Sequence, residues 1–551
     1  MGRKKLLKIA LIVSSLSLVV SSLAGCGDSE ANKPKTQREQ TIVYNLAVDP
    51  KSIDPAKNNA VDGATVLSNA FEGLMRIDNN DKIVNGVAEK YEMSKDGLSY
   101  TFTLRKDAKW SDGKAVTAQD FEYAWKRALK KETAAEYAYQ LYYIKNGQKY
   151  NKSQVTEDQV GVKAENDTTL KVTLESPTSY FLDLMAFPTY FPVRKDVVEK
   201  APDTWATTPE TYICNGPFKM SEWKAKDSLT FVKNENYWDA KSVKLNKVVY
   251  KMIVDANTYL SAFKTGDLDF IETPPNQETP QLLKDKIAEI APNLGTYFYV
   301  INMTDKAKQL DPEAAKALQD VKVRKALTNA IDRKVLVESV TKGGQTPAKS
   351  FVPKGIPDAN GKAFAEKEYF KPTGDIELAK KLLAEAGYPD GKNFPKITFV
   401  YNDNELHQKV AQAVQDMWKK NLNINIELKK EEWKVFQVTR TDKNYLMARH
   451  GWLGDYVDPM TFLDIFETES GNNDAGYSNK EYDKYIELAK KEVDPTKRSE
   501  YLHKAEDILM EDMPIIPMYY YTNVLCIKDY VKNVHKSPLG FVFFRDAYIQ
   551  N

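Results

Sequence analysis

KITFVYNDNELHQKVAQAVQDMWKKNLNINIEL, residues 396–428, is the stretch that decides the fold class. Apolar side chains recur at every second residue over 397–401, at every fourth residue over 406–418 and at every second residue over 422–428. The two-residue spacing is typical of a β-strand and the four-residue spacing of a helix. Strand, helix and strand in this order predict a crossover unit, in which two parallel strands are joined by a helix packed on the sheet.

Similar patterns extend this prediction to the rest of the chain. A strand followed by a helix is predicted at residues 247–263, and a further strand at 41–48. Residues 91–104 predict a β-hairpin because an Asp-Gly turn separates two alternating runs. Thr117 is expected to cap a helix with an apolar stripe. We therefore predict an α/β fold in more than one lobe, with an additional hairpin-containing region.

The N-terminus has the pattern of a lipoprotein signal. Basic residues in the first eight positions precede an apolar run over 9–20, and small residues lead up to Cys26. The run is too short to span a membrane, so residues 1–25 are predicted to be a removed signal peptide and Cys26 the lipidated residue. Residues 26–40 contain almost nothing apolar and are expected to form a flexible tether. The protein is expected on the outer face of a cell membrane, as a Gram-positive-type lipoprotein.

Composition excludes several function classes. Seventy-eight basic and 77 acidic residues leave no net field for a nucleic acid. Cys214 and Cys526, the two cysteines besides Cys26, form no disulfide framework and are expected to be buried thiols, although they could pair in an oxidising compartment. The four histidines lack the spacing of a metal site, so no metal or cofactor is predicted. GxSxG, P-loop and GxGxxG motifs are absent, which lowers the expectation of an enzyme.

One short stretch concentrates charge. MARHGWLGDYVDPMTF, residues 447–462, holds Arg449, His450, Asp455 and Asp458 on a predicted glycine-containing loop. Such a group could be a hydrolytic site, a metal site or a clamp for a charged ligand. An aspartate before a proline is a common helix start, so Asp458 is interpreted as structural. Asp455 on its own would be a turn residue, and composition cannot decide further.

These residues, and others along the chain, resemble a known family. Residues 448–459 look like a loop of extracellular oligopeptide-binding proteins in the peptide/nickel solute-binding family, the ligand-capturing subunits of ABC importers. Other stretches that resemble the family are 71–74, 96–113, 119–125, 215–218, 401–407, 432–436 and 514–521. The resemblance therefore extends over nearly all of the chain that follows the predicted tether.

The resemblance implies a periplasmic-binding-protein-like fold. Two α/β lobes close about a hinge on the ligand, and a third, smaller lobe packs on one of them. The implied boundaries are 1–25 for the signal peptide, 26–40 for the lipid-anchored flexible tether, 41–72, 204–295 and 522–551 for the three segments of lobe I, 73–203 for the small lobe II, and 296–521 for lobe III. The expected partners are an oligopeptide, ABC permease subunits and the membrane through Cys26. The protein is expected to be a monomer that binds no nucleic acid and has no catalytic residue.

The resemblance also implies a binding site. Asp455 matches the aspartate that pairs with the α-ammonium of the peptide, and Arg449, Arg440 and His407 match groups that receive its carboxylate. Positions that match the lining of the groove are Val61, Tyr137, Trp433, Gly451, Trp452 and Tyr521. His450 has no assigned role. The arginines as surface cations, a solvated His407, and Trp433 and Tyr137 as packing aromatics remain alternative interpretations.

Physical reasoning supports a peptide ligand independently. An extended peptide of two to five residues advances about 3.3 Å per residue, so its terminal charges lie roughly 7 to 17 Å apart. One fixed anion and several spaced cations can bracket such lengths. Asn59 departs from the family, which has an acidic residue two positions before Val61. The preferred peptide length therefore stays open. Other ligands in the same fold also remain alternatives, namely a dipeptide, a peptide pheromone, a nickel chelate or an oligosaccharide. A secreted peptidase is the alternative function.

Overall fold

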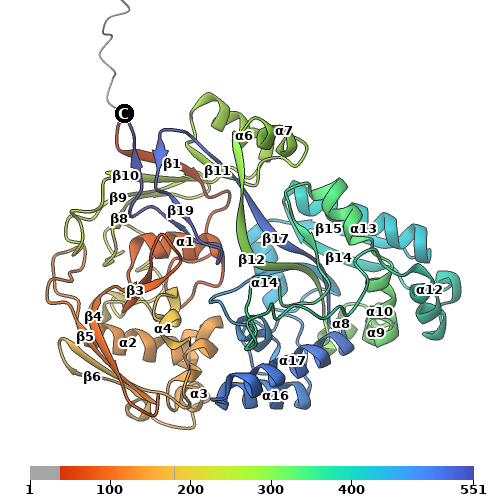
Figure 1. Ribbon diagram of the computed structural model, residues 1–551, viewed down its shortest axis with the longest axis horizontal. Helices are drawn as coiled ribbons and strands as arrows, with labels where there is room; N and C mark the ends of the chain where they lie inside the picture. Colours follow the sequence, from red (N-terminus) through yellow and green to blue (C-terminus); the bar gives the residue numbers. More distant parts are fainter. Residues whose placement is uncertain (1–37, 179) are drawn as a thin grey trace, which may run out of the picture. The chain divides into compact units, whose positions relative to one another are not determined.

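The computed structural model describes residues 38–178 and 180–551 (Figure 1). The predicted signal peptide, Cys26 and the predicted tether up to residue 37 lie outside the described residues. Glu39–Gln550 form one compact unit. In the other unit the described residues are Arg38 and Asn551, and the Arg38 backbone nitrogen donates to Asn551 Oδ1 at 2.6 Å. Within the described ranges, no helix combines the length and apolarity needed to cross a membrane.

A single mixed sheet of eleven strands organises Glu39–Gln550. Its strands, in spatial order, are β15 (Ile426–Glu431), β14 (Ile397–Asn402), β16 (Met447–Leu453), β12 (Ala288–Ile301), β17 (Ile515–Ile527), β11 (Phe270–Glu272), β1 (Thr41–Asn45), β10 (Lys247–Lys251), β9 (Ser228–Lys233) and β8 (Phe218–Lys224), with β13 (Thr346–Pro347) paired to β17. Helices pack beside both ends of this order (Figure 1). The prediction of an α/β fold is confirmed.

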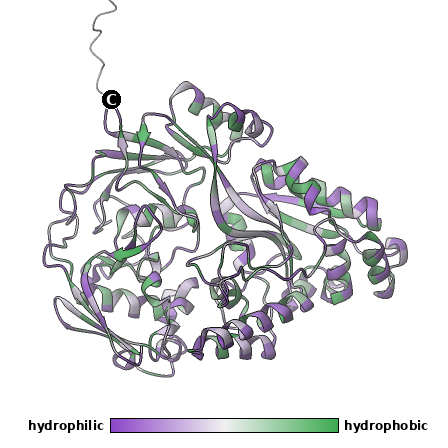
Figure 2. Cartoon of the chain, viewed as in Figure 1, coloured by the Kyte–Doolittle hydropathy of each residue, from purple (hydrophilic) through white to green (hydrophobic). Residues whose placement is uncertain are grey.

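The crossover unit predicted from residues 396–428 is confirmed. Strands β14 and β15 pair in parallel, and α13 (Glu405–Leu422) connects them. Asn404 caps the helix by accepting a hydrogen bond from the His407 backbone nitrogen at 3.1 Å, and Asn423 ends it in a left-handed conformation. Alternating apolar and polar faces of α13 are visible in Figure 2. The buried face belongs to a hydrophobic core that includes Val410 and Trp418.

The other predicted local elements also form. Strand β10 leads into α6 (Ala256–Thr265), and β4 (Ala88–Met93) pairs with β5 (Ser99–Leu104) as a hairpin. Gly97 in the turn has φ +68°, a conformation that favours glycine. Helix α2 (Ala118–Leu129) begins with a capping box formed by Thr117 and Asp120. The hairpin continues into a separate four-stranded sheet with β7 (Thr169–Thr173) and β6 (Val162–Asn166).

The remaining elements cover the sheets or connect their strands. The α-helices are α1 (Val61–Ala70), α3 (Gly147–Asn151), α4 (Phe181–Leu184), α5 (Lys195–Val198), α7 (Thr279–Lys284), α8 (Asp305–Leu310), α9 (Pro312–Gln319), α10 (Val321–Asn329), α11 (Arg333–Val335), α12 (Ile376–Glu385), α14 (Trp433–Thr441), α15 (Met460–Leu463), α16 (Lys480–Lys491) and α17 (Pro495–Asp512). Short 3₁₀ or π turns are η1 (Lys131–Thr133), η2 (Glu136–Tyr143), η3 (Glu157–Gln159), η4 (Pro188–Tyr190), η5 (Leu336–Thr341), η6 (Pro389–Gly391) and η7 (Asp464–Phe466). Short strand pairs are β2 (Met75–Ile77) with β3 (Ile83–Asn85), β18 (Val531–Lys532) with β21 (Tyr548–Ile549), and β19 (His535–Lys536) with β20 (Val542–Phe543).

Two long central strands join the two halves of the main sheet. On one side β12 and β17 continue into β16, β14 and β15, and on the other into β11, β1 and β10. Their pairing is regular over Ala288–Pro292, and register shifts follow between Pro292 and Thr296 and between Tyr297 and Phe298. A break in a ladder allows two strands to bend and twist locally. The break lies next to the predicted lobe boundaries at residues 295 and 521.

The charged stretch 447–462 differs from the prediction. Residues 447–453 form strand β16 and are no loop, because they pair with β12 along their whole length. Gly451 therefore lies inside a strand. Asp458 and Pro459 precede a helix, as their order suggests, and α15 begins at Met460. Asp458 accepts a hydrogen bond from the Met460 backbone nitrogen at 2.9 Å and forms a two-pronged ion pair with Arg498 at 2.8 Å.

The two cysteines of the described chain are buried free thiols, as predicted. Cys214 Sγ donates to the Phe218 carbonyl oxygen at 3.4 Å, and Cys526 lies on β17 in the core that β11 shares with α6. Burial raises the pKa of each thiol to about 12. Neither thiol is therefore activated as a nucleophile.

Candidate functional site

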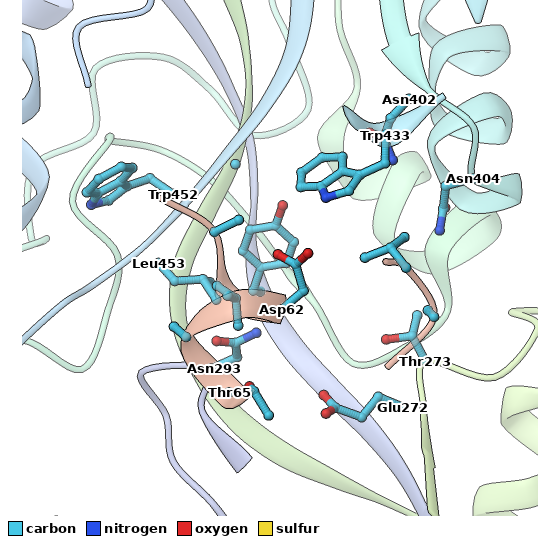
Figure 3. Close-up of a pocket in the computed structure, with 18 of the residues that line it drawn as sticks. Asp62, Thr65, Glu272, Thr273, Asn293, Asn402, Asn404, Trp433, Trp452 and Leu453 are labelled. Carbon is cyan, nitrogen blue, oxygen red and sulfur yellow. The ribbon is translucent and has the colours of Figure 1, made fainter. Parts of the chain in front are cut away.

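A cavity of about 430 Å³ opens where β12 and β17 pass between the halves of the sheet (Figure 3). Asn293 from the break in β12 and Tyr519, Tyr521 and Asn523 from β17 form part of its wall. Further lining residues come from the ends of β1 and β14, the starts of α1, α13 and α14, strand β16, and loops elsewhere in the chain. The sheet break thus places side chains from both halves around one space.

Asp455 lines this cavity and is held there by neutral groups. Tyr137 Oη donates to its Oδ1 at 3.2 Å, and Gln140 Nε2 donates to its Oδ2 at 2.9 Å. Its backbone nitrogen donates to Thr461 Oγ1 at 2.9 Å. Burial raises the pKa of Asp455 to about 8, although both side-chain hydrogen bonds act to lower it. A buried carboxyl stabilised by neutral donors alone is suited to receive a cation.

Arg449 projects from β16 into the same cavity. Its guanidinium donates to Tyr521 Oη at 3.0 Å and lies over the Tyr297 ring, 5.1 Å from the ring centre. Its Nε is shielded from solvent and makes no hydrogen bond within the described residues. No carboxylate is among the groups that shift its pKa. Arg449 is therefore a lining cation whose charge no carboxylate of residues 38–178 or 180–551 balances in an ion pair.

Gly451 gives Tyr521 the room for this contact. A Cβ at Gly451 would lie 2.1 Å from Tyr521 Oη, which is far inside any allowed contact. The glycine is required by the neighbouring hydroxyl group rather than by loop flexibility. This corrects the prediction that Gly451 lies on a loop.

Arg440 also lines the cavity, but its charge is already paired. Its Nε lies 3.0 Å from Asp474 Oδ2, and His450 Nε2 lies 2.9 Å from the same oxygen. Burial acts to raise the pKa of Asp474, but Arg440 and then His450 outweigh it and lower the pKa. His450, stacked on Phe298 with ring centres 4.6 Å apart, has a pKa of about 4 because of burial and then Arg440. His450 is thus a neutral member of a buried network, which gives it a structural role.

His407 lines the cavity in its neutral form. Burial, and after it the charge of Arg449, hold the pKa of His407 well below its ordinary value. Its Nδ1 is shielded from solvent without a hydrogen bond in the described residues. In this form the imidazole could donate or accept a hydrogen bond, but it brings no positive charge to the cavity.

The positions expected to line a groove all border this cavity. Trp452 packs against Tyr137 with ring centres 6.2 Å apart and donates through its indole to the Thr461 carbonyl oxygen at 2.7 Å. Trp433, at the start of α14, lies opposite Trp452 in the view of Figure 3. Val61 begins α1 and is 36% exposed. These side chains give the cavity apolar walls between its charged groups.

Sequence reasoning missed three polar residues of the site. Gln140 holds Asp455, Asp474 neutralises Arg440, and Asp62 projects into the cavity from the first turn of α1. Gln140 is the one amide in a tyrosine-rich run, EYAYQLYY, and this could have marked it in the sequence. Asp474 and Asp62 carry no local pattern that would mark them. Among the described residues no cluster of three or more His, Cys, Asp or Glu could hold a metal ion.

Comparisons with known proteins agree with this architecture. Residues 82–474 match the model of the bacterial extracellular solute-binding proteins, family 5 Middle. The oligopeptide-binding protein OppA of Bacillus subtilis is 41% identical, over 98% of each chain. The crystal structure of Haemophilus influenzae OppA in complex with the peptide RPPGFSPFR has a TM-score of 0.85 at 33% identity and covers 94% of this chain and 100% of that chain.

A third relative bears on the conformation. A structure of the murein tripeptide binding protein MppA of Escherichia coli has a TM-score of 0.84 at 34% identity, covering 93% of this chain and 99% of that chain. The unliganded open form of MppA, also 34% identical and covering 93% of this chain and 97% of that chain, has a TM-score of 0.61. At the same identity, this structure is therefore more similar to the first MppA structure than to the open form.

A cavity between two halves of a sheet that two long strands join, together with these relatives, places the chain in the class of solute-binding proteins. The chain belongs to the bacterial extracellular solute-binding proteins, family 5. The resemblance to the peptide/nickel solute-binding family and the periplasmic-binding-protein-like α/β fold are thereby confirmed.

Proposed function

We propose that this protein captures extended oligopeptides in the cavity and delivers them to an ABC permease. One observation carries the proposal: a buried carboxyl, Asp455, and a cation, Arg449, border the same cavity, and neither is paired with an opposite charge of the described chain. A peptide with free ends has one ammonium and one carboxylate. It therefore supplies both missing partners.

The position of the cavity between the two halves of the sheet suits the capture of a ligand. A ligand that contacts both halves of the sheet binds the closed form better than the open one, so it shifts the population towards closure. The bend at the register shift of β12 and β17 is the proposed hinge, and the lobe boundaries 41–72, 73–203, 204–295, 296–521 and 522–551 belong to this proposal. Closed, liganded protein is what the permease would recognise.

Further parts of the proposal concern location and chemistry. The protein is anchored through lipidated Cys26, and its folded part begins after a tether that ends near residue 40. It acts as a monomer and performs no catalysis. Bacillus subtilis OppA and Haemophilus influenzae OppA are binding proteins, which supports the last point. The arrangement of Asp455 and Arg449 needs no proton transfer to a reacting atom.

Peptides with chemically capped ends test the proposal. Tetra-alanine, its N-acetyl form and its C-amide are titrated into the purified mature protein by calorimetry. Each cap should weaken binding by at least about tenfold, because a charge-assisted contact contributes about 1.5–3 kcal/mol. Equal affinity for all three peptides would contradict the proposal, and so would cleaved products in a mass spectrum taken after incubation. Mass spectrometry of ligands that copurify would then define peptide length.

A further inference from the structure

The charges around the cavity do not balance after a simple peptide has bound. Six carboxyl side chains border it: Asp62, Glu136, Glu272, Asp403, Asp455 and Asp474. Four of them have a basic partner in the protein, because Glu136 pairs with Lys51, Glu272 with Lys536, Asp403 with Lys430 and Asp474 with Arg440. Asp455 and Asp62 form no ion pair within the described chain. Among the arginine and lysine side chains that border the cavity, Arg449 alone has no carboxylate partner in the described chain.

A peptide with uncharged side chains would satisfy only two of these three groups. Its ammonium matches Asp455 and its carboxylate matches Arg449, which leaves Asp62 as a negative charge without a partner. A third ligand charge, positive and on a side chain, would complete the balance. Enclosed charges interact more strongly than exposed ones, so such an imbalance influences which ligand binds.

The surroundings of Asp62 keep it oriented towards the cavity. Asp62 lies in the first turn of α1, and its carboxyl group points into the space between Trp433 and Leu453 in Figure 3. Its Oδ2 is shielded from solvent and has no hydrogen-bond partner among the described residues. The neighbouring Lys434 is held elsewhere, 2.8 Å from Asp49 Oδ2.

Burial makes the charge of Asp62 costly. It raises the pKa of Asp62 to about 6, while the backbone amides of Gly63 and Asp62, the Trp433 indole and Lys434 act in the opposite direction. The carboxyl is mostly ionised at neutral pH, and a cation placed beside it would stabilise that form. Trp433 borders the same cavity, and an indole ring is a favourable neighbour for an ammonium or guanidinium group.

We propose that Asp62 is a specificity-determining residue that selects peptides with a basic side chain, lysine or arginine, at one position. This inference rests on the proposed function, since it requires peptide termini at Asp455 and Arg449. It concerns a different wall of the cavity and a different part of the ligand.

A lysine scan tests the inference. Four tetra-alanine peptides, each with one lysine at a different position, are compared by calorimetry with peptides that carry norleucine, of similar length but uncharged, at the same position. At one position the wild-type protein should bind lysine about ten- to a hundredfold more tightly than norleucine, as expected for a charge-assisted contact. Asp62→Asn should reduce this ratio of affinities to below about twofold. A twofold ratio corresponds to about 0.4 kcal/mol, the size at which independent effects on free energy stop being distinguishable.

Matched variants separate a charge effect from a folding effect. Asp62→Glu keeps the charge and should retain a lysine preference, which a purely structural role of Asp62 would not predict. Asp403→Asn removes another lining carboxylate, one that is already paired with Lys430, and should leave the lysine ratio unchanged. If Asp62→Asn does not fold, the wild-type scan together with Asp62→Glu still decides.

Failure of this inference is distinguishable from failure of the proposed function. Tetra-alanine binding that depends on both free termini, with a lysine ratio below about twofold at all four positions, overturns the role of Asp62 alone. A lysine preference that persists in Asp62→Asn also overturns it. Absence of binding to all the peptides contradicts the proposed function, and the inference falls with it.

Discussion

The two charged ends of the cavity respond to burial in different ways. Around Asp455, burial raises the pKa to about 8, so the carboxyl is largely protonated at neutral pH until a cation arrives. Around Arg449, burial acts to lower the pKa, but the tyrosines, Tyr521 first, outweigh it and the pKa is raised. A guanidinium stays charged at any physiological pH. One end is therefore switchable, and the other is permanently charged.

This difference shows that a protein can accommodate a buried ionisable group without a counter-ion in two ways. The carboxyl can become neutral by taking a proton, so Tyr137 and Gln140 are sufficient partners. Arginine does not become neutral in this range, and its charge is stabilised by an aromatic ring and a hydroxyl group instead. A ligand should therefore exchange protons at one end of the cavity and not at the other.

Arg440 provides the largest expected effect and tests whether Arg449 is really the available cation. Arg440→Met leaves Asp474 buried without its arginine, so the free energy of unfolding should fall by about 3–5 kcal/mol. Chemical denaturation measures it. Arg449→Met, which breaks no ion pair of the described chain, is the matched control and should cost much less stability. Equal losses in the two variants would remove the contrast between these arginines.

Asp455→Asn tests the switchable end. Affinity for tetra-alanine should fall by about 3 kcal/mol, because the peptide ammonium is left in the cavity without an anion. Affinity for N-acetyl-tetra-alanine should hardly change, since that peptide has no ammonium to lose. Calorimetry on both peptides gives the answer. A variant that still discriminates between the free and acetylated peptides would place the ammonium elsewhere.

Arg449→Met tests the permanently charged end and should have a smaller effect. Affinity for a free carboxylate should decrease by about 2 kcal/mol, whereas the C-amide peptide should bind as it does to the wild-type protein. The effect is smaller because the neutral His407 borders the same space and can still donate to a carboxylate. Wild-type discrimination between acid and amide in this variant would contradict the assignment.

The local fold was predictable where burial follows a simple period. Residues 396–428 alternate their apolar side chains at spacings of two and four because one face of each element packs on the core, and β14, α13 and β15 form as expected. Strand β16 was missed because Gly451 and Gly454 suggest a loop, whereas Gly451 is needed to admit Tyr521. The long β12 was missed as well, since proline and glycine interrupt its pattern.

Residue types at the site were predictable, but their charge states were not. All expected lining residues border the cavity, because a family resemblance transfers positions along the chain. The charge state of each depends on partners from distant segments, such as Asp474 for Arg440 and Gln140 for Asp455. Burial of His407 likewise follows from packing around α13 and the neighbouring Arg449. Sequence spacing carries no information on such contacts.

The pH dependence of binding gives the smallest and most specific test of the switchable end. Without a cation beside it, Asp455 has a pKa of about 8, and pairing with an ammonium must lower that pKa in the complex. Between these two values, binding releases a proton. Affinity for tetra-alanine should therefore fall about tenfold, or about 1.4 kcal/mol, for each unit that the pH drops below 8. Above about pH 8 it should fall again as the peptide's own amino group loses its proton.

Calorimetry in two buffers of different ionisation enthalpy measures the released proton directly. About one proton should be released near pH 6 with the wild-type protein, because the free carboxyl is protonated there and the paired one is not. Asp455→Asn should release none from this site. Arg449→Met should retain the release, since the guanidinium does not titrate in this range. Affinity that stays constant between pH 5 and 8, with no proton released, would mean that Asp455 is already ionised before the ligand arrives, and the contrast between the two ends of the cavity would then disappear.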